Sequence, residues 1–142
     1  MQPIDYVVPM VFTDDEQWRD ECSRALNRPK ETLEDIPRWR SWGTEELLIR
    51  GILINMPWIR RIHIILSGES QVRPWMQDIS PKVRIVFHKD FIPEQYLPCF
   101  VSRTIEMFLD NVQGLAERVI YGNDDMYPVG AMRPEDFFVG SK

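Results

Sequence analysis

Cysteine is scarce in this 142-residue sequence, which contains only Cys22 and Cys99. Two thiols cannot form a disulfide framework, and neither has a second cysteine at the C-x-x-C spacing typical of metal sites. We therefore expect two buried thiols in a protein of a reducing compartment.

An excess of basic residues is also missing, because the net charge is −5. This excludes the basic footprint of a nucleic-acid-binding protein. No apolar stretch is long enough to span a bilayer. The N-terminal apolar run contains Asp5 and has no basic residues before it, so it does not resemble a signal peptide. These absences predict a cytoplasmic protein with no transmembrane segment, and they leave open a peripheral position at the inner membrane.

Glycine-rich phosphate-binding fingerprints, internal repeats and low-complexity tracts are absent as well. What is present is the length of one domain with 44% hydrophobic residues, enough to bury a core. Four apolar runs rich in β-branched and aromatic residues predict strands near 4–12, 59–66, 82–88 and 117–122.

Three longer segments between these runs have helical spacing, at about 16–27, 44–56 and 100–112, and a short turn of helix begins at Pro74. Alternation of strands and helices predicts an α/β domain with a mostly parallel sheet and helices on both faces. In the second helix we expect Leu47, Leu48 and Ile52 to face inward. Gly51 of that helix allows close approach of another backbone. Residues 28–41 are charged and contain two prolines, so we expect the least ordered internal loop there.

The strongest candidate for a functional motif is Asn123-Asp124-Asp125, which follows the apolar run Val119–Tyr121. In open α/β sheets, ligands bind beyond the carboxyl ends of the strands. Carboxylate and amide oxygens are hard ligands suited to Mg²⁺ or Mn²⁺. We expect the last strand to be buried on both faces. A plain turn is the alternative for the acidic motif, because Asn and Asp often end strands.

The two histidines have different settings. His63 lies among isoleucines in the middle of a predicted strand, which favours a structural role. His88 closes the third strand, where a catalytic role and a structural role are both open. Ser67-Gly68-Glu69-Ser70 follows the second strand and is suited to a ligand or to a simple turn.

Several motifs occur together and in a recognisable order: Ile4–Pro9, Arg50-Gly51, Pro57–His63, His88–Pro93, Leu97-Pro98, Gly114-Leu115, Tyr121–Met126 and Pro134–Phe138. Over residues 3–138 the sequence resembles the Stealth family of sugar-1-phosphate transferases. That family includes capsular polysaccharide phosphotransferases and the lysosomal-enzyme N-acetylglucosamine-1-phosphotransferase.

The resemblance implies a GT-A-like α/β core, a nucleotide-sugar donor such as UDP-N-acetylglucosamine, a glycan acceptor and Mg²⁺ or Mn²⁺. The sugar-1-phosphate would pass to an acceptor hydroxyl, which is phosphoryl transfer. Carried over by position, the resemblance implies catalytic roles for Arg50, His88, Asp124 and Asp125, with both aspartates as metal ligands. It implies substrate contacts for four further residues, Asp15, Arg40, Ser102 and Asn123.

Five positions depart from the family pattern by lacking its usual residue: Met10, Phe12, Thr13, Ser41 and Val101. The sequence also ends soon after Phe138, where family members continue. These departures indicate a fragment or a shortened relative. Three functions stay open: a capsular or exopolysaccharide phosphotransferase, a non-catalytic nucleotide-sugar-binding relative, and a metal-dependent glycosyltransferase.

Overall fold

The computed structural model describes residues 2–33 and 41–140 of the chain. Four parallel strands form one sheet in the order β3-β2-β1-β4. The strands are β1 (Ile4–Pro9), β2 (Arg61–Leu66), β3 (Val83–Phe87) and β4 (Arg118–Tyr121). The predicted α/β class with a mostly parallel sheet is confirmed, and the arrangement is consistent with a GT-A-like fold.

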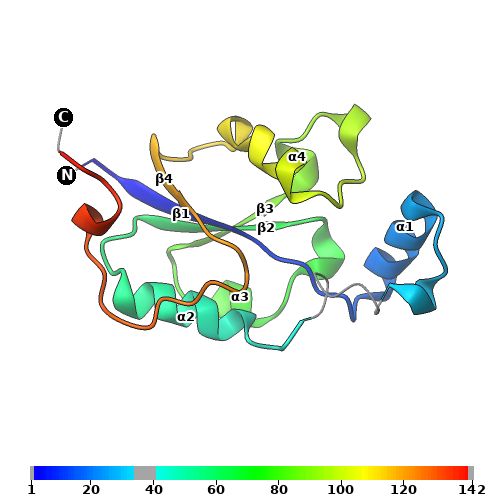
Figure 1. Ribbon diagram of the computed structural model, residues 1–142, viewed down its shortest axis with the longest axis horizontal. Coiled ribbons are helices and arrows are strands. Elements are labelled where there is room, and N and C mark those ends of the chain that lie inside the picture. Colours follow the sequence, from blue (N-terminus) through cyan, green and yellow to red (C-terminus); the bar gives the residue numbers. More distant parts are fainter. Residues whose placement is uncertain (1, 34–40, 141–142) are drawn as a thin grey trace.

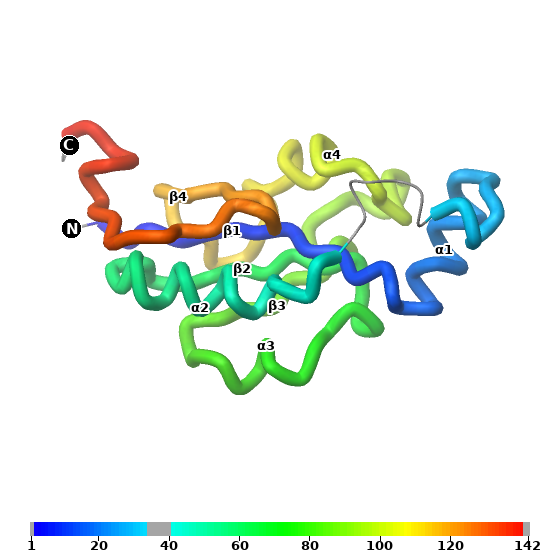
Figure 2. The backbone as a smooth tube through the Cα atoms, turned by 60° about the horizontal axis from the view of Figure 1, so that its bottom comes forward, coloured from blue at the N-terminus to red at the C-terminus, as the bar shows by residue number. Residues whose placement is uncertain are grey.

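Helices cover both faces of the sheet. They are α1 (Glu16–Leu26), α2 (Glu45–Asn55), α3 (Trp75–Asp78) and α4 (Ser102–Met107). α2 and α3 lie on one face and α4 on the other, while α1 stands beyond the carboxyl end of the sheet (Figures 1 and 2). The third long helix is shorter than predicted: Phe108 leaves helical geometry with φ −110° and ψ 9°, and a 3₁₀ turn follows at Leu109–Asn111.

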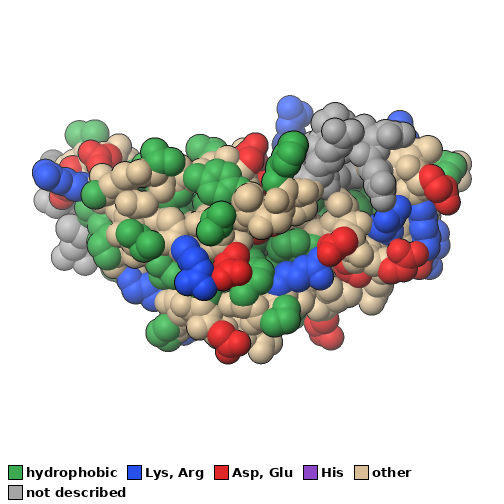
Figure 3. Space-filling model, turned by 90° about the horizontal axis from the view of Figure 1, so that it is seen from below, with side chains coloured by type: hydrophobic (Ala, Val, Ile, Leu, Met, Phe, Trp, Pro, Cys, Tyr) green, Lys and Arg blue, Asp and Glu red, His purple; other side chains and the backbone are tan. Residues whose placement is uncertain are grey.

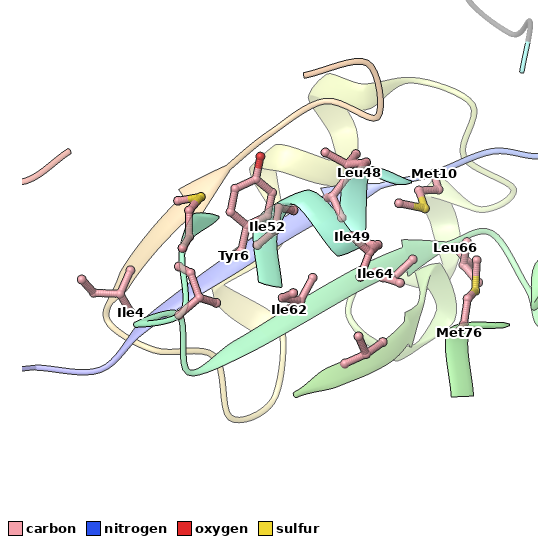
Figure 4. Close-up of a cluster of buried hydrophobic side chains, with 14 of the residues drawn as sticks. Ile4, Tyr6, Met10, Leu48, Ile49, Ile52, Ile62, Ile64, Leu66 and Met76 are labelled. Atoms are coloured by element: carbon pink, nitrogen blue, oxygen red, sulfur yellow. The ribbon is translucent and has the colours of Figure 1, made fainter. Parts of the chain in front are cut away.

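Alternation along the central strands divides the core into two clusters. Ile4 and Tyr6 of β1 pack on the side of α2 and α3 (Figure 4). Val8 belongs to the same cluster, whereas Val7 packs on the α4 side. This is the period-two pattern of an extended strand. The buried face of α2 carries Leu48, Ile49, Ile52 and, just beyond its end, Met56. Leu47 was wrongly expected there: it lies on the outer face and is 61% exposed.

The last strand is not buried on both faces, contrary to expectation. β4 lies at the edge of the sheet, and each of its four residues is only half-buried. β1 is an interior strand, flanked by β2 and β4, and its residues 4–8 are all buried. A short apolar run carries no information about which neighbours will flank it, so the sequence could not distinguish the two cases.

The first strand ends at Pro9, earlier than predicted. Met10 still donates its N–H to the Ile65 carbonyl at 2.9 Å. Beyond Met10, the side chain of Gln71 forms the backbone hydrogen bonds that a neighbouring strand would otherwise form. It accepts from Phe12 N at 2.7 Å and donates to Phe12 O at 2.9 Å. The loop after β1 is therefore fixed by a fully buried amide from the loop after β2.

The predicted loop 28–41 is ordered in its first part. A 3₁₀ turn spans Lys30–Thr32, and Leu33 is buried against Trp18 and Cys22. Residues 34–40, which include Arg40, lie outside the described residues.

Both cysteines are free and buried, as predicted. Among the described residues, no helix combines the length and apolarity that a bilayer crossing requires. On the face of the molecule that carries α2, acidic, basic and hydrophobic side chains are interspersed (Figure 3).

Gly122, which directly follows β4, is required by the packing of Tyr6. A Cβ atom at Gly122 would lie 1.9 Å from the Tyr6 hydroxyl and 2.7 Å from its ring carbon Cζ. Because Tyr6 is only 5% exposed, its ring has little room to move. We expect Gly122→Ala to lower the free energy of unfolding by about 1–3 kcal/mol through overpacking, measured by urea denaturation.

Gly130→Ala is the matched control, because a Cβ there meets no atom within 4 Å. Tyr6→Phe in the Gly122→Ala background should reduce the loss by removing the nearest clashing atom. Equal stability of Gly122→Ala and Gly130→Ala would contradict the packing argument.

Candidate functional site

A cavity of about 310 Å³ lies at the carboxyl end of the sheet. A residue directly after or close behind each of the four strands contributes to its wall: Met10, Ser67, His88 and Asn123. This is the edge at which open parallel sheets bind ligands. The strand order thus brings together four segments that are far apart in the sequence.

Part of the lining of this cavity is aromatic and apolar. Trp18 comes from α1, and Cys99 and Phe100 come from the segment before α4. The Trp18 and Phe100 rings meet edge to face, with centroids 5.8 Å apart at 75°. Such a contact holds the Phe100 ring in a defined orientation toward a ligand.

The acidic motif lines the same cavity. Asp124 is half-buried, whereas Asn123 and Asp125 are exposed. Burial, together with the negative charges of Asp125 and Glu45, raises the pKa of Asp124 to about 6. Glu45 is the first residue of α2 and is itself buried, accepting a hydrogen bond from Ser41 at 2.5 Å. The site therefore concentrates negative charge, which a cation would relieve.

His88 is 7% exposed, and its ring packs edge to face against Phe91 at 6.4 Å. Burial lowers the pKa of His88 to about 4, so the imidazole is neutral at pH 7. A neutral imidazole has one nitrogen that donates and one that accepts a hydrogen bond. The end of β3 is fixed beside it, because Phe87 N donates to the Asp90 carboxylate at 2.9 Å.

This shift in the pKa of His88 predicts a pH effect on stability. The folded-state pKa lies below the ordinary 6.5, so between pH 6.5 and 4 the unfolded chain binds more protons than the folded chain. The stability of the wild type is therefore expected to fall with decreasing pH in this window, by up to about 3 kcal/mol from His88. His88→Gln should flatten the profile of unfolding free energy between pH 4 and 6.5. If the unfolding free energies of the wild type and His88→Gln depended on pH in the same way between pH 4 and 6.5, the result would contradict this role of His88.

The structure brings five of the residues singled out in the sequence to this cavity: His88, Ser102, Asn123, Asp124 and Asp125. It does not bring Arg50 there. Arg50 donates two hydrogen bonds to Glu46, one turn earlier on α2, at 3.0 and 2.7 Å. Arg50 therefore does not line this cavity, and its guanidinium forms a surface ion pair with Glu46; the catalytic role that the resemblance implies for it stays a prediction.

Asp15 also has a different role from the substrate contact expected of it. One carboxylate oxygen caps α1 by accepting from Gln17 N at 3.1 Å. The other accepts from Ser70 at 2.6 Å and from Gln71 at 2.7 Å. Burial alone would raise the pKa of Asp15, but these hydrogen bonds lower it below its ordinary value. The carboxylate positions the loop after β1 and does not line the cavity.

His63 has the structural role that was predicted. It is 2% exposed, and its Nε2 atom lies 3.0 Å from the Asp5 carboxylate. Asp5 also accepts two hydrogen bonds from Arg60 and one from Ala116 N. This cluster ties β1 and β2 to the segment that precedes β4.

The cavity lining also includes residues that were not assigned to the site from the sequence: Pro9, Met10, Val11, Trp18, Ser67, Cys99, Phe100 and Ile105. Ser67 belongs to the polar loop that was considered suited to a ligand, so its signal was present. Cys99 and Phe100 carried no signal, because a cysteine and a phenylalanine in a proline-rich loop are as common in cores as in sites.

The segment after the acidic motif is held along α2. The Asn55 side chain donates to the Pro128 carbonyl at 2.8 Å, and Trp58 Nε1 donates to the Met132 carbonyl at 2.7 Å. A Cβ at Gly51 would lie 3.3 Å from the Pro128 oxygen, so the expected close backbone approach is confirmed. These contacts hold the segment after the acidic motif alongside α2 (Figure 1).

Comparison with known families agrees with this arrangement. The model of Stealth protein conserved region 2 matches residues 38–142, which include His88, Ser102 and the acidic motif. The chain belongs to the Stealth family. Of the predicted site residues, only Asp15 lies outside the matched region, because it precedes residue 38.

Stealth relatives align with nearly the whole chain. Capsular polysaccharide phosphotransferase CpsJ of Streptococcus thermophilus is 35% identical over 98% of this chain and 59% of its own length. Capsular polysaccharide phosphotransferase WcwK of Streptococcus pneumoniae is 32% identical over 97% of this chain and 42% of its own length. Exopolysaccharide phosphotransferase cps2G of Lactiplantibacillus plantarum is 33% identical over 95% of this chain and 39% of its own length. The chain thus spans about two to three fifths of the length of these relatives.

The donor set of the Stealth cavity is compatible with a metal that arrives with its substrate. Among the residues that the structure describes, no three His, Cys, Asp or Glu side chains are grouped closely enough to hold a metal ion. Asp124, Asp125 and the Asn123 amide line the cavity and are its candidate oxygen ligands. Mg²⁺ is commonly held by one or two carboxylates, with substrate phosphates and waters completing its shell.

Proposed function

We propose that this Stealth domain binds a nucleotide-sugar donor in the cavity of about 310 Å³ and takes part in transferring its sugar-1-phosphate to a glycan hydroxyl, in capsule or exopolysaccharide synthesis. The observation that carries the proposal is the convergence of the acidic motif with residues behind all four strands. The names of the Stealth relatives support a phosphotransferase reaction.

Asp124 and Asp125 would hold Mg²⁺ or Mn²⁺, which would neutralise the charge of the donor phosphates. The raised pKa of Asp124 supports this assignment, because burial and the charges of Asp125 and Glu45 disfavour its ionised form, which a bound cation would stabilise. Phosphoryl transfer depends mainly on positioning and charge neutralisation.

The chain's own side chains would position the reactants. The neutral imidazole of His88 can accept a hydrogen bond from an acceptor hydroxyl and so orient it, and the exposed hydroxyl of Ser102 can donate to a phosphate oxygen. The Phe100 ring, held by Trp18, offers a flat apolar surface for the base or the sugar of a UDP-N-acetylhexosamine. Because such donors are cytoplasmic metabolites, the proposed reaction belongs to the cytoplasm or its membrane surface.

A non-catalytic binding relative is the second candidate, and the loop after β1 favours it. Met10 and Phe12 are each 5% exposed and packed into the core, where the family pattern has other residues. Asp15 is occupied by internal hydrogen bonds. These positions cannot give a nucleotide the polar contacts implied by the family pattern, so we expect weak donor binding and slow turnover.

Product analysis distinguishes the candidates. The chain is incubated with UDP-N-acetylglucosamine, Mn²⁺ and a mixture of neutral oligosaccharides, and nucleotide release is followed by chromatography. UMP identifies transfer of the sugar phosphate, whereas UDP identifies a glycosyltransferase and overturns the proposal. Donor binding without release of either nucleotide identifies the binding relative. Rapid UMP release would contradict the expectation of slow turnover.

A further inference from the structure

A second and larger cavity, of about 740 Å³, adjoins the first. One wall is the last turns of α1, with Glu21, Arg24 and Ala25, and the other is the segment 94–100. α1 and this segment stand at the same end of the molecule (Figure 1). The proposed donor site does not involve these α1 residues.

The two cavities share a boundary. Ser67, His88, Cys99 and Phe100 line both of them. The acidic motif lines only the smaller cavity, and the α1 residues line only the larger one. A ligand in the larger cavity would therefore meet a donor in the smaller one at the His88 side chain.

The lining of the larger cavity suits an uncharged polyhydroxyl ligand. Carboxylates of Glu21 and Glu94 can only accept hydrogen bonds at neutral pH, whereas Arg24 and Lys89 can only donate. A hydroxyl group needs both kinds of partner. Two acids beside two bases disfavour a polyanion and a polycation equally. The apolar surfaces of Leu97 and Phe100 can pack on the C–H face of a sugar ring.

We propose that this larger cavity is the acceptor subsite, which binds a neutral glycan and directs one of its hydroxyls to His88. The inference rests on the proposed function and assigns the second substrate to a place of its own. In the step it implies, the acceptor oxygen bonds to the β-phosphorus of the donor, and the bond from that phosphorus to the bridging oxygen breaks. UMP leaves with the bridging oxygen, the His88 imidazole orients the acceptor hydroxyl by accepting its hydrogen bond, and the hydroxyl proton passes to water.

A bulky residue on α1 tests this assignment. Ala25→Trp places an indole in the larger cavity, while Leu26→Trp places the same group at the next residue, which lines neither cavity. Binding of the labelled chain to an array of neutral bacterial oligosaccharides measures glycan affinity. Calorimetry with UDP-N-acetylglucosamine and Mn²⁺ measures donor affinity on the same proteins. Glu94→Gln is a second variant that removes a charge without adding bulk.

We expect Ala25→Trp to weaken glycan binding at least about tenfold and to leave donor binding unchanged, with Leu26→Trp equal to the wild type in both. Glu94→Gln should weaken glycan binding with the fold intact in thermal melts. Glycan binding retained by both cavity variants, or no glycan bound by the wild type, would overturn the acceptor subsite. Loss of donor binding in Ala25→Trp would assign the cavity to the donor instead. Failure of the wild type to bind donor while it binds glycans would overturn the proposed function, and the larger cavity would then be a glycan-binding site without the transfer reaction.

Discussion

Replacing Asp125 by alanine is expected to abolish metal-dependent donor binding without unfolding the protein. Asp125 is exposed and lines the acidic cavity, so its side chain contributes little to packing. Loss of a direct ligand should weaken Mn²⁺-dependent binding of UDP-N-acetylglucosamine by at least about 100-fold, since even outer-shell changes cost 10–100-fold. Calorimetric titration of both proteins with Mn²⁺ and donor measures the effect.

The same substitution should leave stability unchanged or slightly raised, because the charge of Asp125 contributes to the raised pKa of its neighbour Asp124. Asp78→Ala is the control, because Asp78 is exposed on α3 and lines neither cavity. A structural turn at Asp125 predicts the reverse: a loss of roughly 0.5–1.5 kcal/mol in unfolding free energy with metal binding intact. That result would show that the acidic motif is a structural turn at the end of a strand and not a metal site.

Replacing Asp5 by alanine is expected to cost more stability than any other change considered for this chain, about 3–5 kcal/mol. Asp5 is fully buried and accepts hydrogen bonds from Arg60 at 2.8 and 2.6 Å, from Ala116 N at 2.9 Å, and contacts His63 at 3.0 Å. Its removal leaves these groups without their shared carboxylate. Urea denaturation at pH 7 measures the loss, with exposed Asp110→Ala expected within about 0.5 kcal/mol of the wild type.

The pH dependence gives this prediction a second test. Burial alone would raise the pKa of Asp5, but hydrogen bonds from Arg60, Ala116 and His63 bring it below its ordinary value of 3.8. The carboxylate therefore contributes stability above pH 3.8 that is lost as the pH falls through its lower folded-state pKa. The difference between the wild type and Asp5→Ala should shrink in acid. A difference that is independent of pH would show that lost packing, and not the charge, explains the effect.

The order of strands and helices could be predicted because hydrophobic periodicity is local. The runs at 59–66 and 82–88 became β2 and β3 almost without change. Their arrangement in the sheet is set by long-range pairing, which the runs do not encode. For this reason the sequence wrongly predicted that β4 is buried on both faces, whereas it lies at the edge of the sheet.

The candidate site also has residues that could be predicted from the sequence and residues that could not. Residues at the carboxyl ends of strands, such as His88 and Asp124, could be assigned because parallel strands place those ends at one edge. Arg50 and Asp15 could not be assigned, because each is engaged by a partner: Glu46 one turn away, and Gln71 from another loop. Family resemblance gives the residue type at such positions but not the contacts that this chain makes.

Anomalous diffraction from crystals grown with Mn²⁺ and UDP-N-acetylglucosamine is the most direct test of the account. We expect a Mn²⁺ peak bound by Asp124 and Asp125, with the donor phosphates completing its coordination and the donor contained in the cavity lined by His88 and Phe100. A metal–donor complex bound elsewhere, with the acidic motif free of both ligands, would contradict the assignment of this cavity.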